Sequence, residues 1–355
     1  MKLFRYLTLF FPSLTFAVEP SGKSFIDYFK PTPIVGKLSK DVWGAPEVGP
    51  RDSQNGLEDV TRKQWDYWDG TILKAPDGRF HLFGSRWDQA GGHNTWWGSK
   101  AVHAVSDNLY GPYKDQGLLW PDNGNGGGHN VTAIALPDGR YAIVVSETRA
   151  GDVFVSDSLD GPWKALGKLQ VADNEFKDQG KMSNVSIMVR PDGDFQIIAR
   201  SGAIWISKNG ILGPYVIQGK SIYYQAKGLS LRDLEDPVIW HSGGLYHVVV
   251  NSWSDRKAYH LSSVDGINDW KYRGIAYDPT KDFIRYTDGT VNHWNKLERA
   301  GIYMENGHVA AITLAAIDVP KDDEKGNDSH GSKILVLPFD GAALDRDFQE
   351  TPAGK

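Results

Sequence analysis

The fold is decided by a short stretch that reads Asn130-Val-Thr-Ala-Ile-Ala-Leu-Pro-Asp-Gly-Arg-Tyr141 and continues as Ala142-Ile-Val-Val145. An apolar stretch with polar interruptions meets an Asp-Gly turn, and a second apolar stretch follows. Asp-Gly supplies the positive φ that a tight turn between antiparallel strands requires. The stretch therefore predicts a β-hairpin whose first strand begins at Asn130.

Five copies of this pattern occur along the chain, which is typical of a repeat architecture. Their turn glycines lie roughly 50 to 60 residues apart. A second apolar hairpin follows each of the first four copies, as in 102–113. Two hairpins make a four-stranded blade, so the sequence predicts an all-β, five-bladed β-propeller. A β-sandwich or an up-and-down barrel does not require this two-hairpin unit. The copies begin at Asp69, Asn130, Asn184, Asp236 and Glu298.

The segments outside the repeats set the expected domain boundaries. Residues 1–17 combine basic residues, an apolar core and Thr15-Phe16-Ala17, the pattern of a secretory signal peptide. Residues 18–63 lack the repeat and are interpreted as an extended N-terminal arm, which could also pair two copies of the chain. The propeller is expected at 64–345, with a C-terminal tail at 346–355. The fifth copy keeps only one strand after its hairpin, so its edge strand is expected from the N-terminal segment.

Composition narrows the class of protein. The chain has no cysteine, which excludes disulfides and thiolate metal sites. A net charge of −5 argues against nucleic acid as the main ligand. No segment beyond the signal peptide is apolar enough to span a membrane. We therefore expect a secreted or periplasmic bacterial protein.

The innermost strand of each blade begins near the propeller axis, so the five opening residues should face one shared funnel. Asp69, Asp236 and Glu298 are carboxylates. Convergent carboxylates in a concavity suit glycosidic bond cleavage, because one group must protonate the leaving oxygen and another must activate water or attack the sugar. The same residues could instead cap strand ends or bind a structural Ca²⁺, although no cofactor is required for hydrolysis.

Further candidates lie in loops around the predicted funnel. Histidines beside strand starts are placed to exchange protons, tryptophans offer flat faces to sugar rings, and arginines can bind a carboxylate or sulfate. Other tryptophans, at 205, 240 and 270, are expected to pack between blades. The candidate substrate-binding residues are His129, Asn130, Asn184, Trp87, Trp97, Trp253, Arg86, Arg256, Arg285 and Glu298, with His93, Trp96 and Trp294 nearby.

With five blades and Asp-rich strand starts, the chain resembles the five-bladed glycoside hydrolase superfamily that includes families 43, 32, 62 and 117. The segments Tyr67-Trp-Asp-Gly-Thr-Ile72 and Glu235-Asp-Pro-Val-Ile-Trp240 carry this resemblance. Family 43 implies an Asp base on blade one, an Asp on blade two and a Glu acid on blade three. Asp69 fits the first role, but amides stand at the other two places, which leaves Glu147 as a replacement acid.

Family 117 implies an Asp base, a second Asp and a histidine acid, which Asp69, Asp236 and His293 match in order. The expected function is hydrolysis of a glycosidic bond in a poly- or oligosaccharide with inversion. Asp69 would activate water, Asp236 would tune or position it, and His293 or Glu147 would protonate the leaving group.

Two alternatives remain open from the sequence. A polysaccharide lyase would abstract a sugar proton with His129 or His293 and a tyrosine such as Tyr67 or Tyr286. A non-catalytic carbohydrate-binding propeller would bind sugar without turnover, because fold alone does not establish activity.

Overall fold

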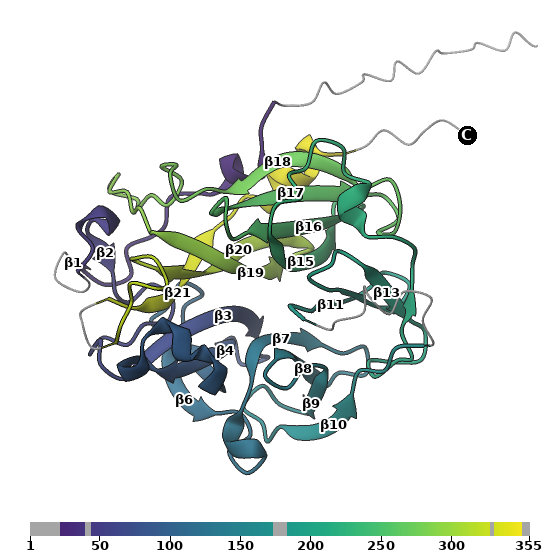
Figure 1. Cartoon of the computed structure of the whole chain (residues 1–355), viewed down its shortest axis with the longest axis horizontal. Helices are drawn as coiled ribbons and strands as arrows, with labels where there is room; N and C mark the ends of the chain where they lie inside the picture. The colour runs from purple at the N-terminus through teal and green to yellow at the C-terminus, as the bar shows by residue number, and fades with distance from the viewer. Residues whose placement is uncertain (1–21, 40–43, 173–182, 327–329, 350–355) are drawn as a thin grey trace, which may run out of the picture.

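The computed structural model describes residues 22–39, 44–172, 183–326 and 330–349. Five antiparallel sheets surround one axis (Figure 1), which confirms the predicted all-β, five-bladed propeller. The predicted signal peptide lies outside the described residues. Within the described part of the chain, no helix has both the length and the apolar character needed to cross a membrane.

Blades one to four each contain four strands that pair in sequence order, from the axis outward. Blade one contains β3 (Trp65–Lys74), β4 (Phe80–Asp88), β5 (Lys100–Ser106) and β6 (Lys114–Leu118). Blade two contains β7 (His129–Ala135), β8 (Tyr141–Glu147), β9 (Asp152–Ser156) and β10 (Lys164–Lys168). Blade three contains β11 (Ser186–Val189), β12 (Phe195–Ile198), β13 (Ile204–Ser207) and β14 (Val216–Ile217). Blade four contains β15 (Leu234–Ser242), β16 (Leu245–Ser252), β17 (Lys257–Ser263) and β18 (Lys271–Tyr277).

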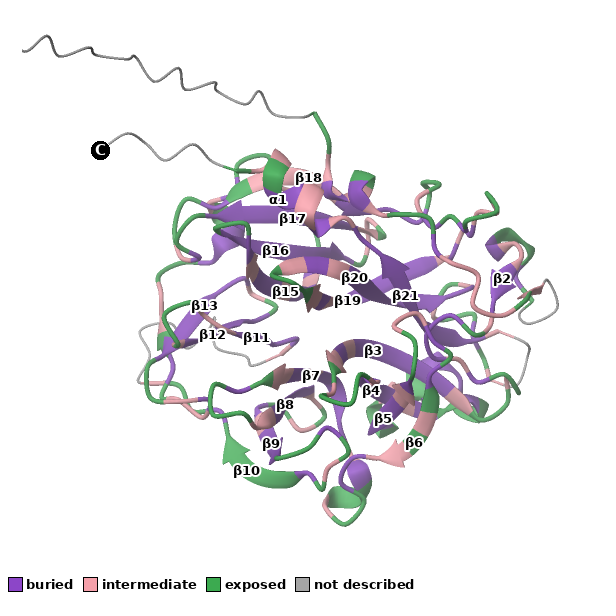
Figure 2. Ribbon diagram, turned by 180° about the vertical axis from the view of Figure 1, so that it is seen from behind, coloured by how far each residue is buried: buried purple, intermediate pink, exposed green. Residues whose placement is uncertain are grey.

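The core lies between neighbouring blades. The inner and middle strands are mostly buried, whereas an outermost strand such as β10 is exposed (Figure 2). Large aromatic side chains fill the wedge-shaped spaces between blades, because each blade twists away from the next. The tryptophans at 205, 240 and 270 are buried in three such clusters, as predicted.

Blade five has three strands, which are β19 (Lys296–Glu305), β20 (His308–Ile317) and β21 (Ser332–Pro338). The N-terminal segment covers the outer edge of β21. Leu57 forms an antiparallel bridge with Ile334, and the Asn55 side chain exchanges two hydrogen bonds with the backbone of Val336. Gly56 is required between them, because a Cβ there would lie 1.9 Å from the carbonyl oxygen of Ile334. The N-terminal segment therefore covers the edge of blade five as expected, through one β-bridge and side-chain hydrogen bonds in place of a full strand.

The rest of the arm packs on the same propeller. A short 3₁₀ helix at Phe25–Tyr28 buries Phe25 against Trp240 and Phe339. Further along the arm, β1 (Leu38–Ser39) pairs with β2 (Arg51–Asp52). At the other end of the chain, helix α1 (Gly341–Asp347) follows β21. The arm thus closes its own chain, and pairing of two copies through it stays a prediction.

Candidate active site

One residue at the start of each innermost strand has left-handed backbone angles. The φ values of these five residues lie between 50° and 68°. Asp and Asn tolerate this conformation better than other non-glycine residues, because their short polar side chains bond locally. The backbone therefore favours Asp or Asn there, whatever the chemistry of the site. We call these residues the axial ring: Asp69, Asn130, Asn184, Asp236 and Arg299.

Blade five departs from the predicted alignment by one residue. Its strand start is Arg299, so the prediction that Glu298 is the equivalent of Asp69 is wrong. The reason lies in the turn. Blade five turns through Asn306 and Gly307 alone, whereas blade one turns through residues 75–79. Counting back from the turn glycine with the blade-one spacing therefore places the start of blade five one residue too early.

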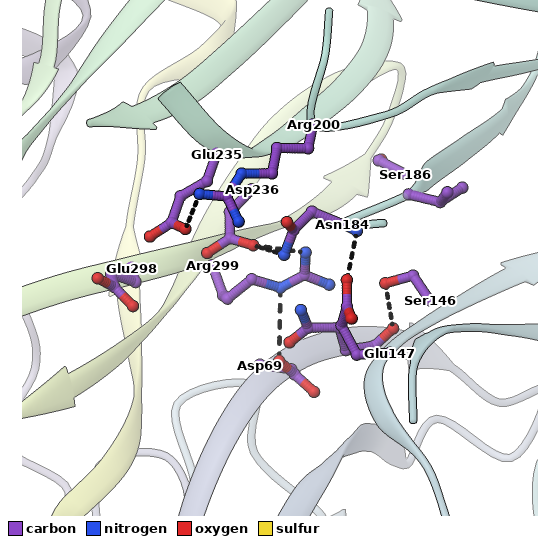
Figure 3. Close-up of polar contacts among 12 residues, drawn as sticks. Asp69, Ser146, Glu147, Asn184, Ser186, Arg200, Glu235, Asp236, Glu298 and Arg299 are labelled. Carbon is purple, nitrogen blue, oxygen red and sulfur yellow. Dashed lines mark hydrogen bonds and ion pairs between the residues drawn. The ribbon is translucent and has the colours of Figure 1, made fainter. Parts of the chain in front are cut away.

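The Arg299 guanidinium lies between two axial carboxylates. Its Nε is 3.4 Å from Oδ1 of Asp69, and a terminal nitrogen is 3.1 Å from Oδ1 of Asp236 (Figure 3). Asn184 donates its side-chain amide to Asp236, and Ser85 donates its hydroxyl to Asp69. Buried charges are tolerated when they are paired and hydrogen-bonded, so the axial ring balances its own charges.

The residue before each axial residue faces a separate cavity. We call these residues the upper ring: Trp68, His129, Ser183, Glu235 and Glu298. All five line a pocket of about 690 Å³ where the inner strands begin, which we call the upper pocket. Asn130, Asn184 and Asp236 also reach its lining. The predicted funnel is therefore present, and the predicted base Asp69 lies outside its lining with 1% of its surface exposed.

Aromatic side chains form one wall of the upper pocket. Trp96 and Trp97, from a 3₁₀ helix at His93–Gly98, stack with ring centroids 3.9 Å apart. Trp96 also packs over His129, which lies 2.9 Å from the Ser99 hydroxyl. Trp97 is 68% exposed at the rim. Exposed stacked indoles offer an apolar face of the size of a sugar ring.

Burial sets the protonation of this histidine. Desolvation lowers the pKa of His129 to about 4, so its ring is neutral at physiological pH. A neutral imidazole donates a hydrogen bond through one ring nitrogen and accepts one through the other, but it lacks the acidic proton of an imidazolium ion. His129 therefore lines the upper pocket as a neutral ring, and its contact with a substrate stays a prediction.

Glu235 is the acidic group in the upper pocket with the largest change in proton affinity. Burial, with the nearby charges of Asp236 and Glu298, raises the pKa of Glu235 to about 8. Burial also raises the pKa of Asp236 to about 6, although Arg299 opposes the shift. A carboxyl group that keeps its proton at neutral pH can act as a general acid. Glu235 lies 3.4 Å from an Arg200 nitrogen.

Glu298, in contrast to Glu235, is held in its ionised form by two lysines. Lys296 lies 2.8 Å from its Oε1, and Lys321 contacts its Oε2. Although burial opposes ionisation, these two cations lower the pKa of Glu298, so its carboxylate is charged at neutral pH. Neighbouring carboxyls with pKa values moved apart are typical of acid–base sites.

A divalent cation fits this acidic group poorly. Glu235, Asp236 and Glu298 place oxygens within 4.8 Å of one another, as Ca²⁺ ligands require. However, side-chain cations already contact Asp236 and Glu298. A Ca²⁺ ion would have to displace them, so we assign it no step, and a structural Ca²⁺ stays a prediction.

Glu147 reaches the upper pocket from the last position of β8. Its Oε1 accepts hydrogen bonds from the Ser183 hydroxyl, at 2.5 Å, and from the Asn184 backbone, at 3.0 Å (Figure 3). Both donors come from blade three, so they fix a blade-two carboxylate across the blade interface. The sequence-based candidate Glu147 therefore lies in the lining of the upper pocket, and its role as an acid stays a prediction.

The predicted acid His293 lies elsewhere. It lines a separate cavity of about 340 Å³ together with Arg256, and its Nε2 is 3.3 Å from Asp282. Neither residue belongs to the lining of the upper pocket. The structure therefore does not bring His293 together with Asp69 and Asp236.

Several predicted substrate contacts also lie away from the upper pocket. Arg86 pairs with Asp115 and stacks on Trp65, and Arg285 lines a groove beside the N-terminal arm. Three of the loop tryptophans lie in three different places. Trp87 lines the upper pocket, Trp253 faces Lys296 outside it, and Trp294 is buried near Arg51.

The tyrosines proposed for a lyase are held by structural contacts. Tyr67 donates its hydroxyl to Asp115, and the Tyr286 hydroxyl accepts a hydrogen bond from the backbone of Asp52. Neither lines the upper pocket with His129. The lyase assignment that combined these tyrosines with a funnel histidine is therefore not supported by their positions.

Sequence reasoning missed Glu235, Arg299, Arg200 and Lys321. The repeat could have identified two of them, because Glu235 directly precedes the blade start Asp236 and Arg299 is itself a blade start. Arg200 follows β12 and Lys321 follows β20 in loops without a recurring pattern. Their approach to the pocket depends on how loops from different blades fold back over the axis.

Comparison with known proteins supports the fold. No protein-family model and no curated protein sequence matches the chain. A family 117 glycoside hydrolase produced by the marine bacterium Zobellia galactanivorans aligns with a TM-score of 0.57 and 12% identity, covering 81% of this chain and 88% of its own. A family 43 β-1,3-galactosidase aligns with a TM-score of 0.53 and 15% identity, covering 80% of this chain and 59% of its own. A protein of unknown function from Dyadobacter fermentans aligns with a TM-score of 0.50 and 11% identity, covering 82% of this chain and 99% of its own. The chain thus shares the five-bladed propeller fold of the two glycoside hydrolases, as its sequence predicted.

Proposed function

We propose that the protein is a secreted glycoside hydrolase that cleaves a glycosidic bond in the upper pocket. The observation that carries this proposal is the raised pKa of Glu235 in a pocket with a tryptophan wall. Glycosidic cleavage needs a carboxyl group that holds a proton at working pH and delivers it to the leaving oxygen. Glu235 meets this requirement without a cofactor.

Glu147 is the partner that we assign as general base. As Glu235 protonates the leaving oxygen, Glu147 takes a proton from water, whose oxygen forms the new bond to the anomeric carbon. Asn184 lies between the two sides of the site, bonded to Glu147 through its backbone and to Asp236 through its side chain. Inversion is the stereochemistry that this assignment implies, because Glu147 activates a water molecule and does not itself attack the sugar.

The proposed roles differ from those expected from the family resemblance. Asp69 pairs with Arg299 and lies outside the lining of the upper pocket, so it is only a second candidate for the base. Asp236 links Asn184 to Arg299, and its charge helps to raise the pKa of the neighbouring Glu235. The acid is Glu235, because His293 faces another cavity.

A non-catalytic carbohydrate-binding propeller is the second candidate. The pairing of Asp69 and Asp236 with Arg299 favours it, because paired axial carboxylates are less available for proton transfer. This candidate keeps the tryptophan wall as a sugar-binding surface.

A screen of algal and plant oligosaccharides distinguishes the candidates. Hydrolysis should release new reducing ends, and proton NMR of the first product should show the inverted anomer. Glu147→Gln should lower turnover by about 10²- to 10⁴-fold, the usual contribution of a general acid or base. Glu305→Gln is the matched control, because Glu305 lies at the far end of β19 and pairs with Lys74 on the surface.

Three results would contradict the proposal. Sugar binding without turnover would establish the non-catalytic propeller. A product with new ultraviolet absorbance from an unsaturated sugar would establish a lyase. Equal turnover in the wild type and Glu147→Gln would remove Glu147 from the mechanism and leave Asp69 as the base.

A further inference from the structure

A second group of chemically active side chains lies between blades one and two, outside the upper pocket. His81 on β4 and His103 on β5 stack with ring centroids 4.9 Å apart. Nδ1 of His81 is 2.8 Å from Nε2 of His103. Asp160, in the loop that follows β9, brings Oδ1 to 3.9 Å from the same Nδ1. One ligand atom of each residue thus lies within 4.8 Å of the other two.

We propose that His81, His103 and Asp160 bind a Zn²⁺ ion that links blade one to blade two. Two imidazole nitrogens and one carboxylate oxygen are a ligand set that Zn²⁺ accepts, with water in the fourth position. Two ligands come from blade one and the third from blade two, so the ion would hold the two blades together.

The surroundings suit metal entry. His81 is fully buried, whereas Asp160 is exposed, so the trio extends from the blade interface to solvent. A cavity of about 220 Å³ adjoins it, with His103, Asp160 and Gln116 in its lining. In the hydrogen-bonded pair one of the two facing nitrogens carries a proton, which must move to the other nitrogen of its ring before an ion can bind both nitrogens.

Blade four contains the same histidine pair without this ligand arrangement. His247 on β16 and His260 on β17 occupy the equivalent strand positions, with Nδ1 and Nε2 3.0 Å apart. The carboxylate of Asp345 lies 4.0 Å from Nε2 of His247, on the opposite side of the ring from the shared edge. The pair is therefore a packing element of the repeat, and blade one adds a carboxylate at its shared edge.

Metal binding requires small local movements. Zn–N bonds of about 2.0 to 2.1 Å in a tetrahedral site place two nitrogens roughly 3.3 Å apart, so the two nitrogens must separate by about half an ångström, and the rings must turn until both lone pairs point at the ion. Asp160 must also exchange its contact with Arg79, 3.1 Å away, for the ion. Arg79 would keep its 2.7 Å pairing with Asp77.

The test measures Zn²⁺ binding to the full chain after treatment with a chelator. Calorimetry should give one equivalent of Zn²⁺, and Co²⁺ in its place should show the visible absorption of a four-coordinate nitrogen–oxygen site. His103→Gln and Asp160→Asn should each weaken binding by about tenfold or more, since loss of even an outer-shell partner costs that much. Asp77→Asn is the matched control, because it removes a neighbouring surface carboxylate outside the trio.

Thermal unfolding adds a readout that does not depend on activity. Zn²⁺ should raise the Tm of the wild type and of Asp77→Asn, because an ion that binds the folded chain stabilises it. Asp160 is on the surface, so Asp160→Asn should fold and lose this increase. Equal Zn²⁺ binding and equal Tm increases in the wild type, His103→Gln and Asp160→Asn would overturn the proposal, as would a wild type that binds no Zn²⁺.

Discussion

The axial ring and the upper ring lie one residue apart in each blade, yet they differ in what determines their residues. Axial residues have left-handed backbone angles, and Asp69, Asp236 and Arg299 satisfy one another's charges. Upper-ring residues face a pocket, and there Glu235 keeps its proton while Glu298 is ionised. The comparison teaches that the polar residues most visible in the repeat satisfy the backbone and one another, while the proposed general acid, Glu235, is the neighbour of one of them.

The largest expected effect is a loss of activity when the upper-ring residue Glu235 is changed. Glu235→Gln should lower kcat by about 10²- to 10⁴-fold, because the amide has no proton to give to the leaving oxygen. Below about pH 4.5, where the Glu235 carboxyl is protonated in the folded and the unfolded chain, the free energy of unfolding of this variant should stay within about 1 kcal/mol of the wild type, since glutamine keeps the shape and polarity of the protonated side chain. Steady-state kinetics and urea unfolding measure both. A variant that retains full turnover would show that the upper ring holds no acid.

The next effect is a loss of stability when the axial residue Arg299 is changed. Arg299→Leu should destabilise the chain by about 3 to 5 kcal/mol, because it leaves Asp69 and Asp236 buried without their cation. Denaturant unfolding gives the difference directly. A loss below about 1 kcal/mol, the range of a surface ion pair, would mean that the axial ring does not depend on Arg299.

A smaller effect is expected at the rim of the upper pocket. Trp97→Ala should raise KM by up to about tenfold with kcat unchanged, because an aromatic stacking contact contributes about 0.5 to 1.5 kcal/mol. Trp97 is exposed and lies on Trp96, so the fold should be unaffected. An unchanged KM would place the sugar on another wall of the pocket, and a fall in kcat alone would indicate a role in the reaction step.

A separate effect is a dependence of stability on pH. The Glu235 pKa is about 8 in the folded chain and near 4.5 in the unfolded chain, so between these values the folded state binds the extra proton. Stability from this group is present below about pH 4.5 and is lost as the pH rises toward 8. The wild type should therefore lose stability relative to Glu235→Gln between pH 5 and pH 8, as measured by urea unfolding at each pH. Parallel profiles for the two proteins would contradict the shift.

The sequence predicted the fold well because local turn chemistry repeats. Asp-Gly and Gly-Gly turns between apolar stretches define the hairpins, and hairpins in a fixed order define blades. The same counting misplaced the start of blade five, because the two-residue turn at Asn306 and Gly307 is shorter than the turn of blade one. Turn type, which sets the count, depends on strand pairing as well as on sequence.

The site was predicted less well, for physical reasons. A blade start identifies Asp69 or Asp236, but one step along a strand reverses the side chain's direction, so the pocket residue is its neighbour. His293, Arg285 and Lys321 lie in loops, whose paths are fixed by contacts between distant segments. Arg200 approaches Glu235 from another blade, and no spacing within a repeat encodes such a contact.

The central claim is that Glu235 holds a proton in the upper pocket at neutral pH. A pH titration of the glutamate side-chain carboxyl groups by carbon-13 NMR tests it without any substrate. The account predicts one glutamate resonance that titrates near pH 8 in the wild type and is missing from Glu235→Gln. If every glutamate titrates near the ordinary value of about 4.3, the site has no proton donor of this kind and the proposed acid is wrong.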